Sequence, residues 1–153
     1  MGYRTKMVHY KLIYFDGRGL AECARQLFAL GDQPYEDVRL SKEQFASLKA
    51  SLPFGQVPVL EVDGKQIAQS QAINRYLGRT FGLTGRDAIE DAIIDSLSDL
   101  CIQYINEITQ CFYVLNGLKK GDIDKMKKET LFPVRDKYLG FVTNFLKENA
   151  KSG

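Results

Sequence analysis

The spacing of hydrophobic residues changes near residue 85 of the chain. Before this point, short aromatic and β-branched runs alternate with runs whose apolar residues recur every three or four positions. The first pattern predicts β-strands and the second predicts amphipathic helices. After this point only the helical spacing occurs. The sequence therefore predicts an α/β part followed by an all-helical part.

The α/β part is expected to follow the order β-α-β-α-β-β-α and to open with a right-handed βαβ unit. An aromatic and β-branched run predicts a strand over residues 10–15, which the turn-forming residues 16–19 end. Apolar residues then recur at helical spacing from Leu20 to Leu30. Residues 35–40 form the second strand candidate.

The rest of the α/β part is expected to contain a capped helix, a hairpin and a final helix. Ser41 and Gln44 have the spacing of a capping box, which predicts a helix over residues 42–50. Asp63-Gly64 is typical of a tight hairpin turn. The remaining predicted elements are strands over 57–62 and 65–68 and a helix that begins at Ser70.

The all-helical part is expected to contain two long helices, over residues 89–115 and from about Asp122 to Glu148. Pro133 is expected to kink the second helix, because proline has no backbone N–H to continue the hydrogen-bond ladder. Both helices carry broad apolar stripes. Each stripe needs a packing partner, which could be the α/β part, a second copy of the chain or further helices.

Composition argues against several classes of protein, including nucleic-acid-binding and membrane-spanning proteins. The 153 residues are 44% hydrophobic and 26% charged, with a net charge of +2, as in ordinary globular proteins. No basic block indicates a nucleic-acid partner, and no apolar run approaches the ~20 residues of a membrane span. Three cysteines without a C-x-x-C pair, and a single histidine, argue against a disulfide framework and a metal site. A cytoplasmic protein without a metal is expected.

Two candidate sites lie at strand ends of the α/β part. Tyr14 stands at the end of the first strand, before a glycine-rich turn and a helix, where α/β sheets bind ligands. A half-buried strand aromatic is the alternative. Gln56, Val57 and Pro58 open the third strand. A cis Val57–Pro58 bond would turn the backbone of Val57 toward a ligand, although a trans bond is commoner in general.

Two further candidate sites lie on helices. Gln69 and Ser70 precede a helix, where Ser70 and the first-turn N–H groups could hold a carboxylate, or Ser70 could be only a helix cap. Phe45 and Lys49 stand one turn apart on a predicted helix. They could flank another carboxylate, or be a core residue and a solvent-exposed residue. No single one of these features identifies a function.

Taken together, three segments resemble cytosolic glutathione transferases. The resemblance is closest to sigma-class-like nematode members and runs from about residue 7 to the end. The segments are YKLIYFDGRGLAE (10–22), LPFGQVPVLEVDG (52–64) and QSQAINRYL (69–77). The resemblance implies a thioredoxin-like domain over residues 7–83 and part of an all-helical domain over 89–150.

The resemblance also implies residue roles. Tyr14 matches the catalytic tyrosine, whose hydroxyl donates a hydrogen bond to the glutathione sulfur. Val57, before the expected cis-Pro58, matches the residue whose backbone pairs with the cysteinyl unit. Gln69 and Ser70 match the pair that holds the γ-glutamyl carboxylate. The positions implied around the glycyl end are Phe45, Lys49 and Gln56.

The implied function is conjugation of glutathione to hydrophobic electrophiles, as in detoxification, by a cytoplasmic homodimer without a cofactor. Two alternatives remain open: a non-catalytic carrier of haem or other hydrophobic ligands, and an inactive truncated transferase. Three positions depart from the family pattern. Leu20 stands where some prostaglandin-isomerising members carry arginine. The acidic group associated with magnesium is reduced to Asp99, so a metal effect is not expected. Gln103 stands where the family often supplies an aspartate to the glutathione of a partner subunit, which puts that contact in doubt. The family normally continues with further helices, so the helical domain is expected to be incomplete and its apolar stripes exposed.

Overall fold

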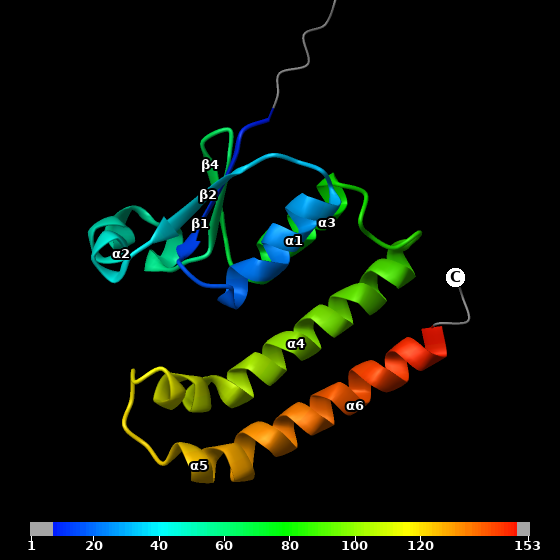
Figure 1. The fold of residues 1–153 in the computed structure, drawn as a ribbon. Helices are drawn as coiled ribbons and strands as arrows, with labels where there is room; N and C mark the ends of the chain where they lie inside the picture. The colour runs from blue at the N-terminus through cyan, green and yellow to red at the C-terminus, as the bar shows by residue number, and fades with distance from the viewer. Residues whose placement is uncertain (1–7, 150–153) are drawn as a thin grey trace, which may run out of the picture. The chain divides into compact units, whose positions relative to one another are not determined.

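The computed structural model describes residues 8–149 and divides the chain into two compact units, one reaching to Gly85 and one beginning at Arg86. The first unit is an α/β fold and the second is helical (Figure 1). The predicted order of strands and helices is confirmed in the first unit, and the second unit is helical as predicted. The domain ends expected at residues 7 and 150 lie outside the described residues.

The first unit is built on a four-stranded mixed sheet in the order β2-β1-β3-β4. β1 pairs with β2 in parallel and with β3 antiparallel, and β4 returns antiparallel to β3. This is the sheet that a βαβ unit followed by a hairpin predicts. The strands are β1 (Tyr10–Phe15), β2 (Glu36–Leu40), β3 (Val59–Val62) and β4 (Lys65–Ala68).

The third strand begins two residues later than predicted. The prediction was 57–62, whereas β3 covers Val59–Val62. Pro58 accounts for the difference, because its nitrogen carries no hydrogen to donate to a neighbouring strand. The hairpin at Asp63-Gly64 is confirmed, since Val62 pairs with Lys65 across it.

Two helices pack together over one side of the sheet. They are α1 (Glu22–Leu30), which follows the short 3-10 turn η1 (Gly19–Ala21), and α3 (Ser70–Thr80) (Figure 1). Alternate residues of β1 face this core, so Tyr10 and Leu12 join it while Ile13 does not. The buried members of this core are Tyr10, Leu12, Ala21, Ala24, Phe28, Leu60, Ile73 and Leu77.

A second, smaller core contains Ile13, Leu40, Leu52 and Val59. Phe45 of α2 (Lys42–Leu48) packs against it. The capping box at the start of α2 is confirmed: the Ser41 hydroxyl accepts from the Gln44 N–H at 3.2 Å, and the Gln44 side chain accepts from the Ser41 N–H at 2.8 Å. The predicted helix over 42–50 ends in the 3-10 turn η2 (Lys49–Ser51), and a second 3-10 turn, η3 (Pro53–Gly55), follows.

The second unit contains α4 (Ala88–Leu115), the short α5 (Ile123–Met126) and α6 (Phe132–Asn149). α4 and α6 lie side by side, and the rings of Tyr104 and Tyr138 stack between them at 4.6 Å (Figure 1). The prediction of one helix from Asp122 to Glu148 was wrong in one respect. A π-helical turn, η4 (Lys127–Leu131), interrupts it just before Pro133. The missing N–H and the bulk of the proline ring explain why the regular ladder breaks there.

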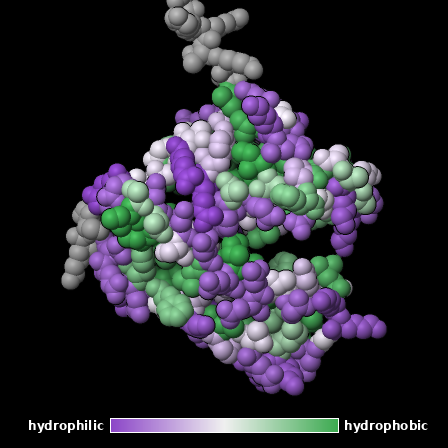
Figure 2. Space-filling model, turned by 180° about the vertical axis from the view of Figure 1, so that it is seen from behind, coloured by the Kyte–Doolittle hydropathy of each residue, from purple (hydrophilic) through white to green (hydrophobic). Residues whose placement is uncertain are grey.

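Large hydrophobic side chains are exposed along the second unit. Hydrophobic and hydrophilic residues are interspersed on the face that Figure 2 shows. The most exposed members on α4 and α6 are Ile89, Phe112, Leu115, Leu139, Phe141 and Leu146. Between residues 8 and 149, no helix is both long enough and apolar enough to cross a membrane.

Candidate functional site

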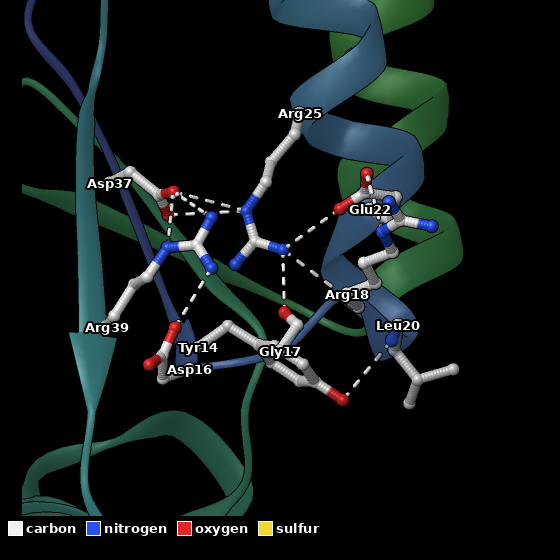
Figure 3. A network of polar contacts seen from close by, with 9 residues as sticks. All are labelled: Tyr14, Asp16, Gly17, Arg18, Leu20, Glu22, Arg25, Asp37 and Arg39. Carbon is white, nitrogen blue, oxygen red and sulfur yellow. Dashed lines mark hydrogen bonds and ion pairs between the residues drawn. The ribbon is translucent and has the colours of Figure 1, made fainter.

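Tyr14 lies at the end of β1 with its hydroxyl directed at the start of the following helical segment (Figure 3). The Leu20 N–H donates a hydrogen bond to the Tyr14 hydroxyl oxygen at 3.2 Å. Because the phenolic oxygen is the acceptor in this bond, its hydrogen is left to donate to another group. The half-buried ring contacts Phe15, with 5.7 Å between ring centroids. The hydroxyl is thus fixed in place and able to act as a donor.

Gly19 makes this position of the Tyr14 hydroxyl sterically possible. Its φ is +43°, and a Cβ at this position would lie 2.5 Å from the Tyr14 hydroxyl oxygen. Sequence reasoning treated Gly19 only as a residue that ends a strand. Its positive φ and its contact with Tyr14 become visible only when the turn is folded.

The Val57–Pro58 peptide bond is cis. The trans bond that general frequencies favour was therefore the wrong prediction, and the cis bond that the resemblance implies is confirmed. Val57 packs against the second core and lies beyond the last paired residues of β1 and β3, Ile13 and Val59. The neighbouring Gln56 side chain accepts a hydrogen bond from the Gln69 amide at 3.3 Å, which joins two of the candidate residues.

Gln69 has a φ of +73°, in the left-handed region that a residue with a side chain seldom adopts. It occupies the N-cap position of α3, but its side chain makes no capping bond. Ser70 is the first residue inside the helix, so the simple reading of Ser70 as the helix cap was wrong. Ser70 is only 9% exposed. An unfavourable backbone conformation retained at a helix start is typical of ligand-binding sites.

Phe45 and Lys49 differ in their surroundings. The Phe45 ring lies 5.0 Å from the Phe15 ring, and Phe15 in turn contacts Tyr14. Phe45 therefore has a packing role whatever else it does. Lys49 is exposed, and its side chain runs past Gly55, where a Cβ would lie 3.4 Å from the Lys49 Cγ.

Charged side chains gather around the turn that follows Tyr14 (Figure 3). Arg25 and Arg39 both contact the carboxylate of Asp37, at 3.2 Å and 2.9 Å. Arg39 also contacts Asp16 at 3.1 Å. The hydrogen bonds to Asp16 and Asp37 raise the pKa of Arg39 above its ordinary value. Sequence reasoning missed this network, because its members come from the turn after β1, from α1 and from β2 and carry no common spacing.

The described residues offer no group of three or more His, Cys, Asp or Glu side chains that could hold a metal ion. The chemistry that this site offers is hydrogen bonding to an anion or a thiol. The Tyr14 hydroxyl accepts from the Leu20 N–H next to one helix start and keeps its own hydrogen to donate, and a second helix start lies at Ser70.

Comparison with known proteins gives consistent matches. Residues 10–79 match the glutathione S-transferase N-terminal domain family. A probable glutathione S-transferase of Caenorhabditis elegans is 48% identical over 147 residues, which are 96% of this chain and 71% of that protein.

Two solved structures extend the comparison. A monomeric glutathione S-transferase from the hookworm Necator americanus is 51% identical, with a TM-score of 0.88 over 92% of this chain and 68% of that chain. A Nu-class enzyme from Haemonchus contortus is 53% identical, with a TM-score of 0.84 over 94% and 70%. The thioredoxin-like fold of the first unit is therefore confirmed, and the chain belongs to the glutathione S-transferase family.

Proposed function

We propose that this protein conjugates the thiolate of glutathione to hydrophobic electrophiles, and that the Tyr14 hydroxyl stabilises the thiolate. The observation that carries the proposal is the hydrogen bond from the Leu20 N–H to the Tyr14 oxygen. It fixes the phenol at the start of a helical segment with its O–H available to the sulfur. Family membership supports the reaction class, and this geometry supports the role of Tyr14.

The energy that the reaction needs is within the range of such contacts. A free thiol has a pKa of about 8.5, and the thiolate is the nucleophile. Lowering that pKa by about two units requires about 2.7 kcal/mol of preferential interaction with the anion. A hydrogen bond to a charged acceptor contributes about 1.5–3 kcal/mol, and a helix N-terminus adds about 0.3–1 kcal/mol. Tyr14 is thus an electrostatic stabiliser, and the nucleophile belongs to the cosubstrate.

The remaining candidate residues would hold the peptide part of glutathione. In this proposal the backbone of Val57, next to cis-Pro58, pairs with the cysteinyl unit. Gln69 and Ser70 hold the γ-glutamyl carboxylate at the start of α3, where helix amides favour an anion. The hydrogen bond between Gln56 and Gln69 supports a shared site. The group placed around the glycyl end comprises Phe45, Lys49 and Gln56.

The finer assignments are part of the same proposal. We assign residues 7–83 to the glutathione-binding domain and 89–150 to part of a helical domain. None of the three cysteines among the described residues forms a disulfide, which supports a cytoplasmic location. A homodimer is proposed from the resemblance, although the Necator americanus relative is described as monomeric. We propose a sigma-class-like assignment from the resemblance, whereas the Haemonchus contortus relative is described as Nu-class. The proposed mechanism does not depend on which class name applies.

Replacing Tyr14 with phenylalanine tests the proposal. Tyr14→Phe should keep glutathione affinity, measured by calorimetry, and lose most of the conjugation of an aryl halide. Tyr113→Phe, the same change on α4, is the matched control and should keep the activity. Unchanged turnover in Tyr14→Phe would remove Tyr14 from the mechanism. A wild-type chain that binds haem or hydrophobic dyes but shows no conjugation would instead support the carrier function.

A further inference from the structure

Arg25 of α1 is the only charged residue within 8–149 that is buried, with 9% of its surface exposed. A buried guanidinium is costly unless its N–H groups are paired. Arg25 meets part of this need through two ion pairs, Nε to Asp37 at 3.2 Å and Nη1 to Glu22 at 3.2 Å. The rest of its bonding is directed at the backbone.

The backbone partners of Arg25 are in the turn between β1 and η1 (Figure 3). Its Nη1 donates to the carbonyl oxygen of Gly17 at 2.8 Å and to that of Arg18 at 3.3 Å. Two residues after Arg18, the Leu20 N–H donates to the Tyr14 hydroxyl oxygen. The buried Arg25 side chain therefore binds the start of the Gly17–Leu20 segment, and the last residue of that segment binds the Tyr14 phenol.

The same turn is held from its other end. Arg39 contacts the Asp16 carboxylate at 3.1 Å and shares Asp37 with Arg25. Asp37 lies on β2, next to the strand that carries Tyr14. The network thus ties the turn to α1 and to the sheet at once. This arrangement fixes the position of the Leu20 N–H relative to the end of β1.

We propose that Arg25 is a positioning residue for thiolate stabilisation, acting through the Gly17–Leu20 turn on the hydroxyl of Tyr14. The inference rests on the role proposed above for Tyr14. The hydrogen bonds and ion pairs of Arg25 go to the turn, to Glu22 and to Asp37 and not to Tyr14, so its effect on the phenol is indirect.

The bonding of Arg25 favours positioning over simple stabilisation. Its Nη2 is buried without a hydrogen-bond partner, so this fork is not fully satisfied. A buried charge with an unpaired N–H is a poor source of folding stability. What it does supply is a planar, rigid fork that fixes two consecutive carbonyl groups and a carboxylate in one geometry. A lysine at this position would keep the charge and lose that fork.

The hydrogen bond from the Leu20 N–H links the position of the turn to the donor strength of the Tyr14 hydroxyl. An N–H that donates to a phenolic oxygen polarises the O–H bond and makes it a stronger donor. Displacing the turn lengthens this bond and also moves the phenol. Both changes weaken the hydrogen bond that the thiolate accepts. The γ-glutamyl contacts proposed for Gln69 and Ser70 lie at the start of α3 and do not depend on the turn.

The test uses the full chain and four proteins: wild type, Arg25→Lys, Tyr14→Phe and the double variant. The measured quantity is the pKa of the bound glutathione thiol, followed by the ultraviolet absorbance of the thiolate. Arg25→Lys should raise this pKa by about one unit. At a pH below the pKa, this lowers the thiolate fraction about tenfold. It should lower kcat with little change in the Kd of glutathione. Arg86→Lys, at an exposed ion pair of the second unit, is the control and should change neither.

In the Tyr14→Phe background, Arg25→Lys should cause no further rise. An equal rise in both backgrounds, or none in the wild-type background, would overturn the proposal. If Arg25→Lys unfolds, Asp37→Asn replaces it, because that change removes the Nε ion pair and keeps Arg25; a smaller rise in the same direction is then expected.

A second readout separates this inference from the proposed function. The Cζ resonance of Tyr14, assigned in carbon-labelled protein by comparison with Tyr14→Phe, should shift in Arg25→Lys without any glutathione present. If Tyr14→Phe leaves the thiol pKa unchanged, the proposed function fails whatever this resonance does. If Tyr14→Phe raises the thiol pKa but the resonance is the same in Arg25→Lys and wild type, only the role of Arg25 is rejected.

Discussion

A Cβ at position 19 would lie 2.5 Å from the hydroxyl oxygen of Tyr14. This distance is shorter than any normal contact, and φ at Gly19 is +43°. Gly19, in the turn after the first strand, therefore limits where the Tyr14 phenol can be. If Tyr14 acts as proposed, the function depends on both residues, although only Tyr14 carries a reactive group.

Gly19→Ala should accordingly impair conjugation. The added methyl group displaces the phenol from the Leu20 N–H, so we expect about a tenfold or larger loss of kcat, equivalent to about 1.4 kcal/mol of transition-state stabilisation. The backbone strain adds about 1–2 kcal/mol of destabilisation. Gly82→Ala separates the two effects, because φ there is +69° but no atom lies within 4 Å of the added Cβ. It should lose stability and keep activity; an equal loss of activity in both variants would contradict this account.

Ser41→Ala should destabilise the first unit through the loss of the capping box at α2. We expect the free energy of unfolding to fall by about 1 kcal/mol, measured by urea denaturation. Ser47→Ala is the control, because Ser47 lies inside the same helix and bonds only to the carbonyl of Glu43. A destabilisation of the same size in Ser47→Ala would show that the cap is not the cause.

The Ser41 hydroxyl should also be visible in the titration of Glu43. Its hydrogen bond to the Glu43 carboxylate at 2.7 Å lowers the pKa of Glu43 below its ordinary value. In Ser41→Ala this pKa should move back up toward the ordinary value, as measured by nuclear magnetic resonance. An unchanged Glu43 pKa would mean that this hydrogen bond does not form in solution.

Tyr138 makes the second unit sensitive to high pH. Burial, with a further contribution from the hydrogen bond to Cys101, raises the pKa of Tyr138 from 10.0 to about 12. The folded state then keeps a proton that the unfolded state loses, so stability is complete below pH ~10 and falls as the pH rises toward 12. Two units correspond to about 2.7 kcal/mol, and partial exposure of the ring reduces the expected loss to about 1 kcal/mol.

Melting temperatures measured between pH 9 and pH 12 check this prediction. Tyr138→Phe should remove the additional loss of stability, whereas Tyr113→Phe should retain it. If wild type and Tyr138→Phe lose stability in parallel, the phenol of Tyr138 is not the group responsible.

Much of the fold could be predicted from local sequence. The strands at residues 10–15 and 65–68 match β1 and β4 at both ends. Alternating side chains and the turn residues that follow determine such elements almost alone. The capping box at Ser41 and Gln44 is local in the same way, since its two partners are three residues apart.

The errors arose where a backbone effect or a distant partner decides the structure. Pro58 shortened β3, and Pro133 is preceded by a π-helical turn that helical periodicity does not register. Gln69 was a candidate from its place before a helix and from the resemblance, but its left-handed backbone could not be read from its side chain. Arg25 and Asp37 are twelve residues apart and meet only when α1 packs on the sheet. No local pattern predicts such a contact.

The decisive measurement is the pKa of the glutathione thiol bound to the wild-type chain and to Tyr14→Phe. In the wild type we expect a pKa about two units below that of free glutathione. In Tyr14→Phe we expect a pKa close to that of free glutathione, with the affinity for glutathione retained. Equal thiol pKa values in the two proteins would contradict the claim that the Tyr14 hydroxyl stabilises the thiolate.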